Sequence, residues 1–428
     1  MKDYVLKGNI CFSKTKDEVC TVENGYVVCL DGICDGVYPE LPEKYRQLSC
    51  IDYEDCLILP GMSDLHVHAP QYSFRGLGMD MELIDWLNTH TFPEESKYAD
   101  LEYAKKAYEI FVKDLQAGAA TRACVFGTLH KEATLLLMDM LEKSGLVSYV
   151  GKVNMDRNCP DYLREENAGQ AAKETKEWIE TSMQRFQRVK PILTPRFIPT
   201  CSDELMDELS ALQRTYDLPI QSHLSENLGE IQWVRELCPD TGFYGEAYDK
   251  HQMFGGKSRT IMAHCVYSPK EEIELMKAQD VFVAHCPESN VNLSSGIAPV
   301  RRYLDWDMKV GLGSDVAAGS ELSLFKAMSM AIQCSKIRWR LVDQQLAPLK
   351  MEEAFYLATK GGGEFFGKVG SFEKGYEFDA VVMDDSALQH PQKLSLEHRL
   401  ERLIYLAGDR HVVGKYVAGR KVLDVYHK

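Results

Sequence analysis

Residues that can bind a metal ion or carry a proton lie at the ends of short apolar runs in the middle of the chain. The first run ends in an H-x-H pair, His66 and His68, whose side chains point to the same side of a strand because strand side chains alternate. Later runs end at His223, His264 and Asp315. Three imidazoles and the Asp315 carboxylate can hold a zinc-like divalent ion and leave a position for water. His264 is then free for hydrogen bonding.

The metal interpretation depends on the coincidence of several such groups. With 12 His in 428 residues, chance alone gives about 0.3 H-x-H pairs per chain. Any one of these histidines is more often a satisfied interior polar group, but five such groups at the ends of strands are not expected by chance. His285 ends another run, but the predicted set of four metal ligands is complete without it. Its role can be either a hydrogen bond to the site or purely structural.

Glu226 follows His223 by three residues, at the start of a helical pattern. It can cap that helix or face the metal. A carboxylate beside a metal-activated water can take and return protons, so we predict a proton shuttle and keep the cap as the alternative.

These residues belong to a pattern of short apolar runs that alternate with segments of helical length. Eight alternations over about 300 residues favour a closed parallel barrel of α/β class, whose active site forms at the carboxyl ends of the strands. The runs are Leu57 to His68, Ala119 to Phe126, Val147 to Met155, Pro191 to Phe197, Pro219 to His223, Thr260 to His264, Val281 to His285 and Val310 to Asp315.

The two ends of the chain have a different pattern, with short apolar runs and turn dipeptides. Asn24-Gly25, Asp31-Gly32 and Asp35-Gly36 are hairpin signals, and Gly408-Asp409 and Gly419 separate the last runs. Strands need neighbours, so we expect the two ends to build one small β unit. The predicted division is 1–58 with 369–428 for this unit and 59–368 for the barrel.

Charge and composition exclude several kinds of partner. The chain has 49 Lys and Arg against 64 Asp and Glu, a net charge of −15, and it lacks a basic run that would neutralise phosphates. Nucleic acid and membrane surfaces are therefore not expected partners. With no apolar span, no signal peptide and 13 scattered cysteines without a C-x-x-C pair, we expect a cytoplasmic protein with reduced thiols.

The H-x-H pair, the later histidines and the final aspartate together resemble the amidohydrolase superfamily of metal-dependent hydrolases. Several longer strings are similar to those of its guanine-deaminating branch, and the resemblance covers almost the whole chain. These strings are Pro60-Gly61, His66 to Phe74, Trp86-Leu87, Thr91-Phe92-Pro93, Pro195-Arg196-Phe197, Gln221 to Asn227, Met262-Ala263-His264 and Gly311 to Val316.

The resemblance implies a distorted (β/α)8 TIM barrel with a small β-sandwich, one zinc ion per chain with iron as an alternative, and a homodimer. It implies hydrolysis of guanine to xanthine and ammonia, in purine catabolism, and binding of the purine by Gln71, Arg196 and Phe197. Two positions depart from the pattern: Leu65 stands where Thr is common, and Glu288 stands where Asn is usual. Glu288 puts a charge near the rim of the site.

The residues implied to bind the purine, called readers below, have side chains that suit guanine. The Gln71 amide can donate and accept, Arg196 offers only donors to the 6-oxo group, and Phe197 can stack on the ring. The alternative is that Arg196 pairs with a carboxylate and Gln71 caps a loop. Thr194-Pro195-Arg196 at the fourth strand end lacks the lysine that bridges two metals in other superfamily members, which favours a single ion.

In the expected mechanism the metal activates water, Asp315 accepts its proton, Glu226 protonates the ring nitrogen beside C2 and then the leaving amine, and His264 stabilises the attacking oxygen. Three alternatives stay open: a deaminase of another amino-substituted heterocycle, a hydrolase of cyclic amides, and a nonenzymatic scaffold of the same ancestry.

Overall fold

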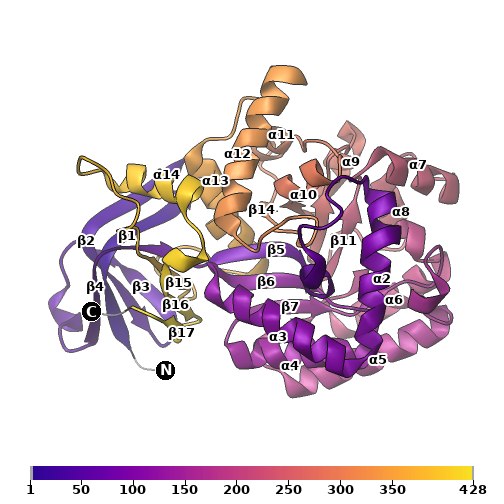
Figure 1. Cartoon of the computed structure of the whole chain (residues 1–428), viewed down its shortest axis with the longest axis horizontal. Coiled ribbons are helices and arrows are strands. Elements are labelled where there is room, and N and C mark those ends of the chain that lie inside the picture. The colour runs from indigo at the N-terminus through magenta and orange to yellow at the C-terminus, as the bar shows by residue number, and fades with distance from the viewer. Residues whose placement is uncertain (1–2, 427–428) are drawn as a thin grey trace.

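The computed structural model describes residues 3–426, which form two parts that lie side by side (Figure 1). One part is a seven-stranded sheet, and the other contains two four-stranded sheets and a two-stranded one, surrounded by helices. The strands are β1 (Tyr4–Thr15), β2 (Glu18–Leu30), β3 (Ile33–Tyr38), β4 (Ser49–Pro60), β5 (Met62–His68), β6 (Ala120–Phe126), β7 (Val147–Gly151), β8 (Val153–Asn154), β9 (Val189–Pro191), β10 (Thr194–Pro195), β11 (Ile220–Leu224), β12 (Thr260–His264), β13 (Phe282–His285), β14 (Val310–Leu312), β15 (Ala380–Met383), β16 (Val412–Val417) and β17 (Arg420–Asp424).

Several of the longer helices begin where a polar side chain caps them. Asp100, Asn167, Ser202, Ser323 and Ser395 each accept a hydrogen bond from the first turn of the helix that follows. The helices are α1 (Leu83–Trp86), α2 (Phe92–Ser96), α3 (Leu101–Ala117), α4 (Lys131–Ser144), α5 (Ala168–Arg185), α6 (Asp203–Tyr216), α7 (Leu228–Leu237), α8 (Tyr244–Asp249), α9 (Lys270–Ala278), α10 (Pro287–Asn292), α11 (Val300–Asp305), α12 (Leu324–Leu341), α13 (Met351–Tyr356) and α14 (Leu396–Leu406).

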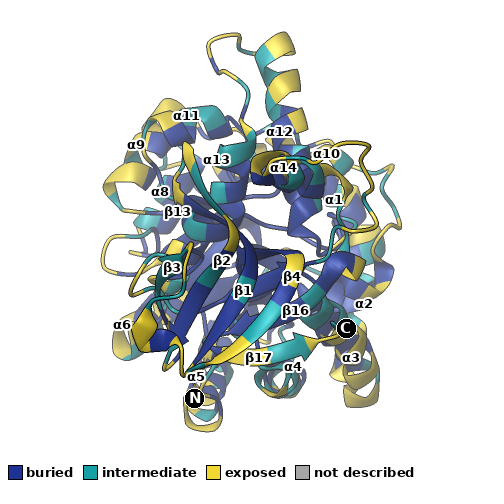
Figure 2. Ribbon diagram, turned by 90° about the vertical axis from the view of Figure 1, so that its left-hand side faces the viewer, coloured by how far each residue is buried: buried dark blue, intermediate teal, exposed yellow. Residues whose placement is uncertain are grey.

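The seven-stranded sheet contains strands from both ends of the chain, in the order β17-β16-β15-β4-β1-β2-β3. Figure 2 looks onto this sheet and shows β1 buried along most of its length. Of the three dipeptides expected as hairpin turns, only Asp31-Gly32 is one, between β2 and β3. The expectation was wrong for Asn24-Gly25 and Asp35-Gly36, which lie inside β2 and β3 near shifts in strand register. Positive φ at Asn24 and Gly36 suits a bulge as well as a turn.

The two four-stranded sheets are parallel, in the orders β5-β6-β7-β9 and β11-β12-β13-β14. Backbone hydrogen bonds join them at both edges. On one side Gln221 N donates to Leu193 O at 2.9 Å, and on the other Asp315 N donates to His66 O at 2.8 Å. The carboxyl ends of the strands therefore gather on one face.

The first predicted run, Leu57 to His68, spans two strands instead of one. Its first part ends β4, which pairs with β15 in the seven-stranded sheet, and its second part is β5. Gly61 separates them at a tight contact, because a Cβ there would lie 2.3 Å from Thr121 Oγ1. The chain thus passes from one part to the other immediately before the H-x-H pair.

A buried ion pair fastens the two parts together. Arg122 on β6 donates from Nε and NH2 to Asp379, at 2.7 and 3.0 Å, and Asp379 also accepts from Ala418 N at 2.7 Å. The side chains of Arg122 and Asp379 are 3% and 0% exposed. Since both charges are out of water, each depends on the other.

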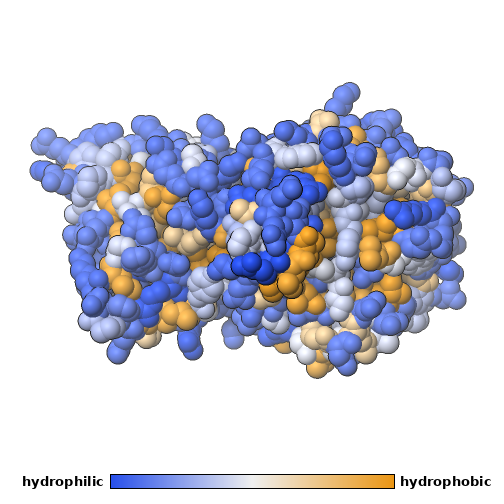
Figure 3. Space-filling view, turned by 90° about the horizontal axis from the view of Figure 1, so that it is seen from above, coloured by the Kyte–Doolittle hydropathy of each residue, from blue (hydrophilic) through white to orange (hydrophobic). Residues whose placement is uncertain are grey.

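Seen from above, the molecular surface is mostly hydrophilic, with hydrophobic side chains in separate patches (Figure 3). Among the helices of residues 3–426, none has the length and apolar character needed to cross a membrane.

Candidate active site

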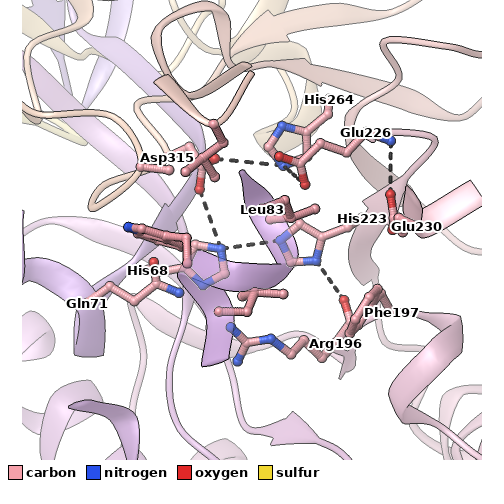
Figure 4. A pocket seen from close by; sticks show the side chains of 14 residues that line it. His68, Gln71, Leu83, Arg196, Phe197, His223, Glu226, Glu230, His264 and Asp315 are labelled. Carbon is pink, nitrogen blue, oxygen red and sulfur yellow. Dashed lines mark hydrogen bonds and ion pairs between the residues drawn. The ribbon is translucent and has the colours of Figure 1, made fainter. Parts of the chain in front are cut away.

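The predicted site residues converge at the carboxyl ends of the parallel strands (Figure 4). His66 and His68 come from β5, His223 from β11 and His264 from β12, and Asp315 follows β14 by three residues. Apart from His223, which is partly buried, all are 4% exposed or less. His264 and Asp315 have φ values of 72° and 47°, a left-handed conformation that costs a non-glycine residue about 1–3 kcal/mol. The surrounding structure holds this conformation at the ends of β12 and β14, on either side of β13.

Four of the six distances among the predicted ligand atoms match those around a tetrahedral ion. Nε2 of His68 lies 3.2 Å from Nε2 of His66 and 3.3 Å from Nε2 of His223. Asp315 Oδ1 lies 3.2 Å from His66 Nε2 and 3.5 Å from His68 Nε2. Ligands about 2.05 Å from a zinc ion are about 3.3 Å apart at tetrahedral angles, so the donor set fits such an ion.

The protonation of these histidines also suits a metal. Burial, followed by neighbouring charges, holds the pKa values of His66, His68 and His223 well below the usual value. The imidazoles are therefore neutral, as metal ligands must be. His223 Nδ1 lies 2.6 Å from the carbonyl oxygen of Arg196, which accepts a hydrogen bond from the Nδ1–H and leaves Nε2 with a free lone pair.

Other donors lie close enough to widen the ligand set. His264 groups with His66 and His223, and separately with Cys286 and Asp315, with the potential ligand atoms of each group within 4.8 Å of one another. His264 Nε2 is 3.7 Å from Asp315 Oδ2, slightly farther than the histidines of β5 are from Oδ1. The shorter distances favour the predicted set.

Glu226 faces the site and does not cap the helix. The cap of α7 is Asn227, whose side chain accepts from Gly229 N at 2.8 Å. Glu226 Oε2 instead lies 3.4 Å from His264 Nε2, and Oε1 accepts from Ser295 Oγ at 3.2 Å. Burial, and secondly the charge of Asp315, raises the pKa of Glu226 to about 8. A carboxyl group that keeps its proton near neutral pH can act as a general acid.

A pocket of about 410 Å³ lies beside these groups and brings in the predicted purine-binding residues. Arg196 and Phe197 follow β10, and Gln71 lies in the turn after β5. The pocket is lined by His68, Gln71, Leu83, Trp86, Leu87, Arg196, Phe197, His223, Glu226, Glu230, His264, Leu293, Asp315 and Ala318.

Arg196 does pair with a carboxylate, as the alternative interpretation allowed. NH1 and NH2 of Arg196 donate to Glu95 at 2.6 and 3.1 Å. Gln71 Nε2 donates to the same carboxylate at 3.0 Å. Both side chains nevertheless line the pocket, so the pairing and a role in binding are compatible.

His285 and Glu288, whose roles the sequence left open, lie around the site. His285 is 2% exposed, and its Nδ1 has no hydrogen-bond partner among the described residues. Burial, and secondly His264, lowers the pKa of His285 to about 3. Glu288 accepts from Ser320 N at 3.2 Å and from Ser320 Oγ at 2.6 Å. Glu288 therefore ties helix α10 to the loop between β14 and α12.

Sequence reasoning missed several residues that hold the site in place. Asn290 Oδ1 lies 2.8 Å from His264 Nδ1, and Glu230 accepts from Glu226 N at 3.1 Å. Asp64 accepts from Ser314 Oγ at 2.5 Å and so fixes the residue before Asp315. Asp64 lies two residues before the H-x-H pair, and this proximity could have identified it. Glu95 and Asn290 have no such signal in the sequence apart from lying near residues discussed in the sequence analysis.

Comparison with known proteins agrees with this arrangement. The model of the amidohydrolase family matches residues 57–422, so the chain belongs to that family. A guanine deaminase from Dictyostelium discoideum is 39% identical over 88% of this chain and 85% of its own length, and one from Homo sapiens is 37% identical over 89% and 85%. A crystal structure of guanine deaminase from C. acetobutylicum with bound guanine is 50% identical, with a TM-score of 0.95, and the alignment covers 98% of this chain and 100% of that one. The resemblance inferred from the sequence is confirmed.

Proposed function

We propose that this chain hydrolyses guanine to xanthine and ammonia. The observation that carries the proposal is that one pocket is lined both by His68, His223, Asp315 and Glu226 and by Gln71 and Arg196. The guanine deaminases that align with this chain over most of their length support the same reaction.

A divalent metal ion held by His66, His68, His223 and Asp315 would act as a Lewis acid and make water nucleophilic near neutral pH. We propose one zinc ion, with iron as the alternative. Three observations support this set: the imidazoles are neutral, their Nε2 atoms are closely spaced, and His223 Nδ1 donates a hydrogen bond to Arg196 O.

The protein's own side chains move the protons of the reaction. Asp315 accepts a proton from the attacking water. Glu226, 3.4 Å from His264, delivers its proton to the ring nitrogen beside C2. It then takes the remaining proton from the attacking oxygen and passes it to the amino group, which leaves as ammonia. The proton held by Asp315 returns to Glu226 and restores the starting state. His264 stabilises the attacking oxygen by a hydrogen bond, a contribution of about 3 kcal/mol in comparable sites. One water is consumed, and the oxygen remains on C2 of xanthine.

The base is read by its edge and its face. Arg196 uses two of its five N–H groups on Glu95, so the others remain for the 6-oxo group. Gln71 pairs with an edge that presents both a donor and an acceptor, and Phe197 stacks on the ring. Adenine carries a 6-amino group, which cannot accept these hydrogen bonds.

The proposal extends to the organisation of the chain. It includes a distorted (β/α)8 barrel over 59–368 and a small β-sandwich over 1–58 and 369–428, of which residues 1–2 and 427–428 lie outside the described part. The backbone hydrogen bonds at both edges of the parallel sheets support the barrel. It also includes a cytoplasmic homodimer that acts in purine catabolism on a small-molecule substrate, without nucleic acid or membrane partners.

The test is ammonia release from a panel of guanine, adenine, cytosine and other amino-substituted heterocycles, with metal content measured on the same sample. We expect release from guanine to exceed that from any other compound. Faster release from another heterocycle would replace guanine as the substrate. No release from any compound by metal-loaded protein would contradict the assignment as a deaminase.

A further inference from the structure

We propose that Glu95 positions Gln71 and Arg196 for the purine, so that it controls substrate affinity without touching the substrate. The inference rests on the function proposed above and adds a residue that the reaction itself does not require. Glu95 lies on α2, far from the strand ends in sequence.

One buried carboxylate serves both readers. Glu95 Oε2 accepts from Arg196 NH1 at 2.6 Å, while Oε1 accepts from Arg196 NH2 at 3.1 Å and from Gln71 Nε2 at 3.0 Å. The side chain of Glu95 is 2% exposed, and that of Arg196 is 3% exposed. Hydrogen bonds to charged groups in such a setting are short and strong, and the bidentate pair fixes the plane of the guanidinium.

The same contacts fix which atoms the readers present. Because Nε2 of Gln71 faces Glu95, its Oε1 is turned the other way and lies 3.4 Å from Ala317 N. The Phe92 ring, on the same helix as Glu95, lies 5.2 Å from Arg196 Cζ and packs against the guanidinium. Helix α2 therefore holds Arg196 through two side chains.

Charge gives a second reason for a carboxylate at this position. The Arg196 guanidinium carries a positive charge, is 3% exposed and lines the same pocket as His68 and His223. Without Glu95 it would be an uncompensated buried cation, which is costly. The pair presents the donors of Arg196 to a neutral base with no net charge.

The preceding residue provides a matched control. Glu94 is also on α2 and also buried, but it accepts from Ser73 Oγ at 2.7 Å and from Lys97 Nζ at 2.6 Å, and it contacts Tyr103. These contacts involve neither Gln71 nor Arg196. Loss of charge at this position tests the effect of altering α2 without altering the readers.

The experiment compares Glu95→Gln with Glu94→Gln and wild type in steady-state deamination of guanine. A glutamine at 95 removes the charge and places an amide N–H₂ against donors of Arg196 or Gln71. We expect KM to rise at least about 10-fold with kcat within about fivefold, because ground-state binding is lost. We expect Glu94→Gln to stay within about threefold in both constants. Metal content and circular dichroism, measured on the same samples, should match wild type.

Two further measurements test the positioning role of Glu95 if Glu95→Gln folds poorly or its kinetics are inconclusive. Glu95→Asp keeps the charge but withdraws the carboxylate, and should also raise KM. In an Arg196→Ala background, Glu95→Gln should add less than about threefold to KM, because residues that act together are not additive. A KM within about threefold of wild type for both Glu95 variants, or full additivity with Arg196→Ala, would overturn the inference. Wild type that fails to deaminate guanine would instead overturn the proposed function, and the inference with it.

Discussion

Nδ1 of His223 lies 2.6 Å from the main-chain carbonyl oxygen of Arg196, so one residue contributes to both halves of the site. Its carbonyl orients a predicted metal ligand, and its guanidinium lines the pocket. Metal binding and base recognition are thus joined through the backbone. A substitution of the Arg196 side chain should separate them.

The first prediction concerns the metal. Purified protein should contain about one zinc or iron per chain, and His68→Ala or Asp315→Ala should lose most of it, because each removes one of four ligands. Arg196→Ala should keep the metal, since the carbonyl that holds His223 remains. Elemental analysis of the three variants measures this. Two tightly bound ions per chain in the active enzyme would contradict the single-metal proposal.

The second prediction concerns the proton carrier. Glu226→Gln should retain metal and bind guanine but turn over at least about 100-fold more slowly, since general acid-base groups contribute that much or more. The variant keeps the size of the side chain and its contact with Ser295, and it loses only the transferable proton. Single-turnover kinetics with bound metal measured in parallel would test it. A near-normal kcat would leave Glu226 without a chemical role.

The third prediction concerns specificity. Arg196→Ala should raise KM and lower kcat/KM for guanine, and the preference for guanine over adenine should shrink. A site built on buried donors rejects a ligand that cannot satisfy them by several kcal/mol. Competition between the two bases in wild type and variant gives the ratio directly. Equal kcat/KM values for guanine and adenine in wild type would show that Arg196 does not read the 6-position.

The fourth prediction concerns the junction between the two parts of the molecule. Arg122→Met should lower the free energy of unfolding by about 3–5 kcal/mol, because it leaves Asp379 buried without its partner. Arg122 NH2 also lies 2.9 Å from Glu377, whose side chain is 39% exposed. Glu377→Gln should therefore cost less than about 1 kcal/mol. Denaturant unfolding would compare the two, and similar losses would contradict the role assigned to burial.

Much of the site could be predicted from the sequence because its residues sit at the ends of recognisable strands. Parallel strands end on one face, so His66, His68, His223 and Asp315 had to meet once the runs were identified. The turn dipeptides were less informative, since Asn24-Gly25 marks a bulge and Asp31-Gly32 a hairpin. Both use positive φ, and only the pairing of the strands distinguishes them.

Only the tertiary structure distinguishes the two roles that the sequence allowed for Glu226, a helix cap and a side chain that faces the site. A carboxylate at the start of a helical pattern satisfies backbone N–H groups or faces a neighbour equally well by sequence. The structure begins α7 one residue later than a Glu226 cap would require, and Asn227 caps it. The side chain of Glu226 is therefore free of a capping role and points toward His264.

The sequence by itself predicted the chemistry proposed for this protein, namely three histidine ligands, a single carboxylate ligand and, through the family resemblance, the donors that suit a purine. Only the tertiary structure decided what holds those groups. Glu95 meets Arg196 across 101 residues of sequence, and Asn290 meets His264 across 26. Such contacts follow from how helices and loops pack around the strands, and packing joins side chains that no local pattern relates.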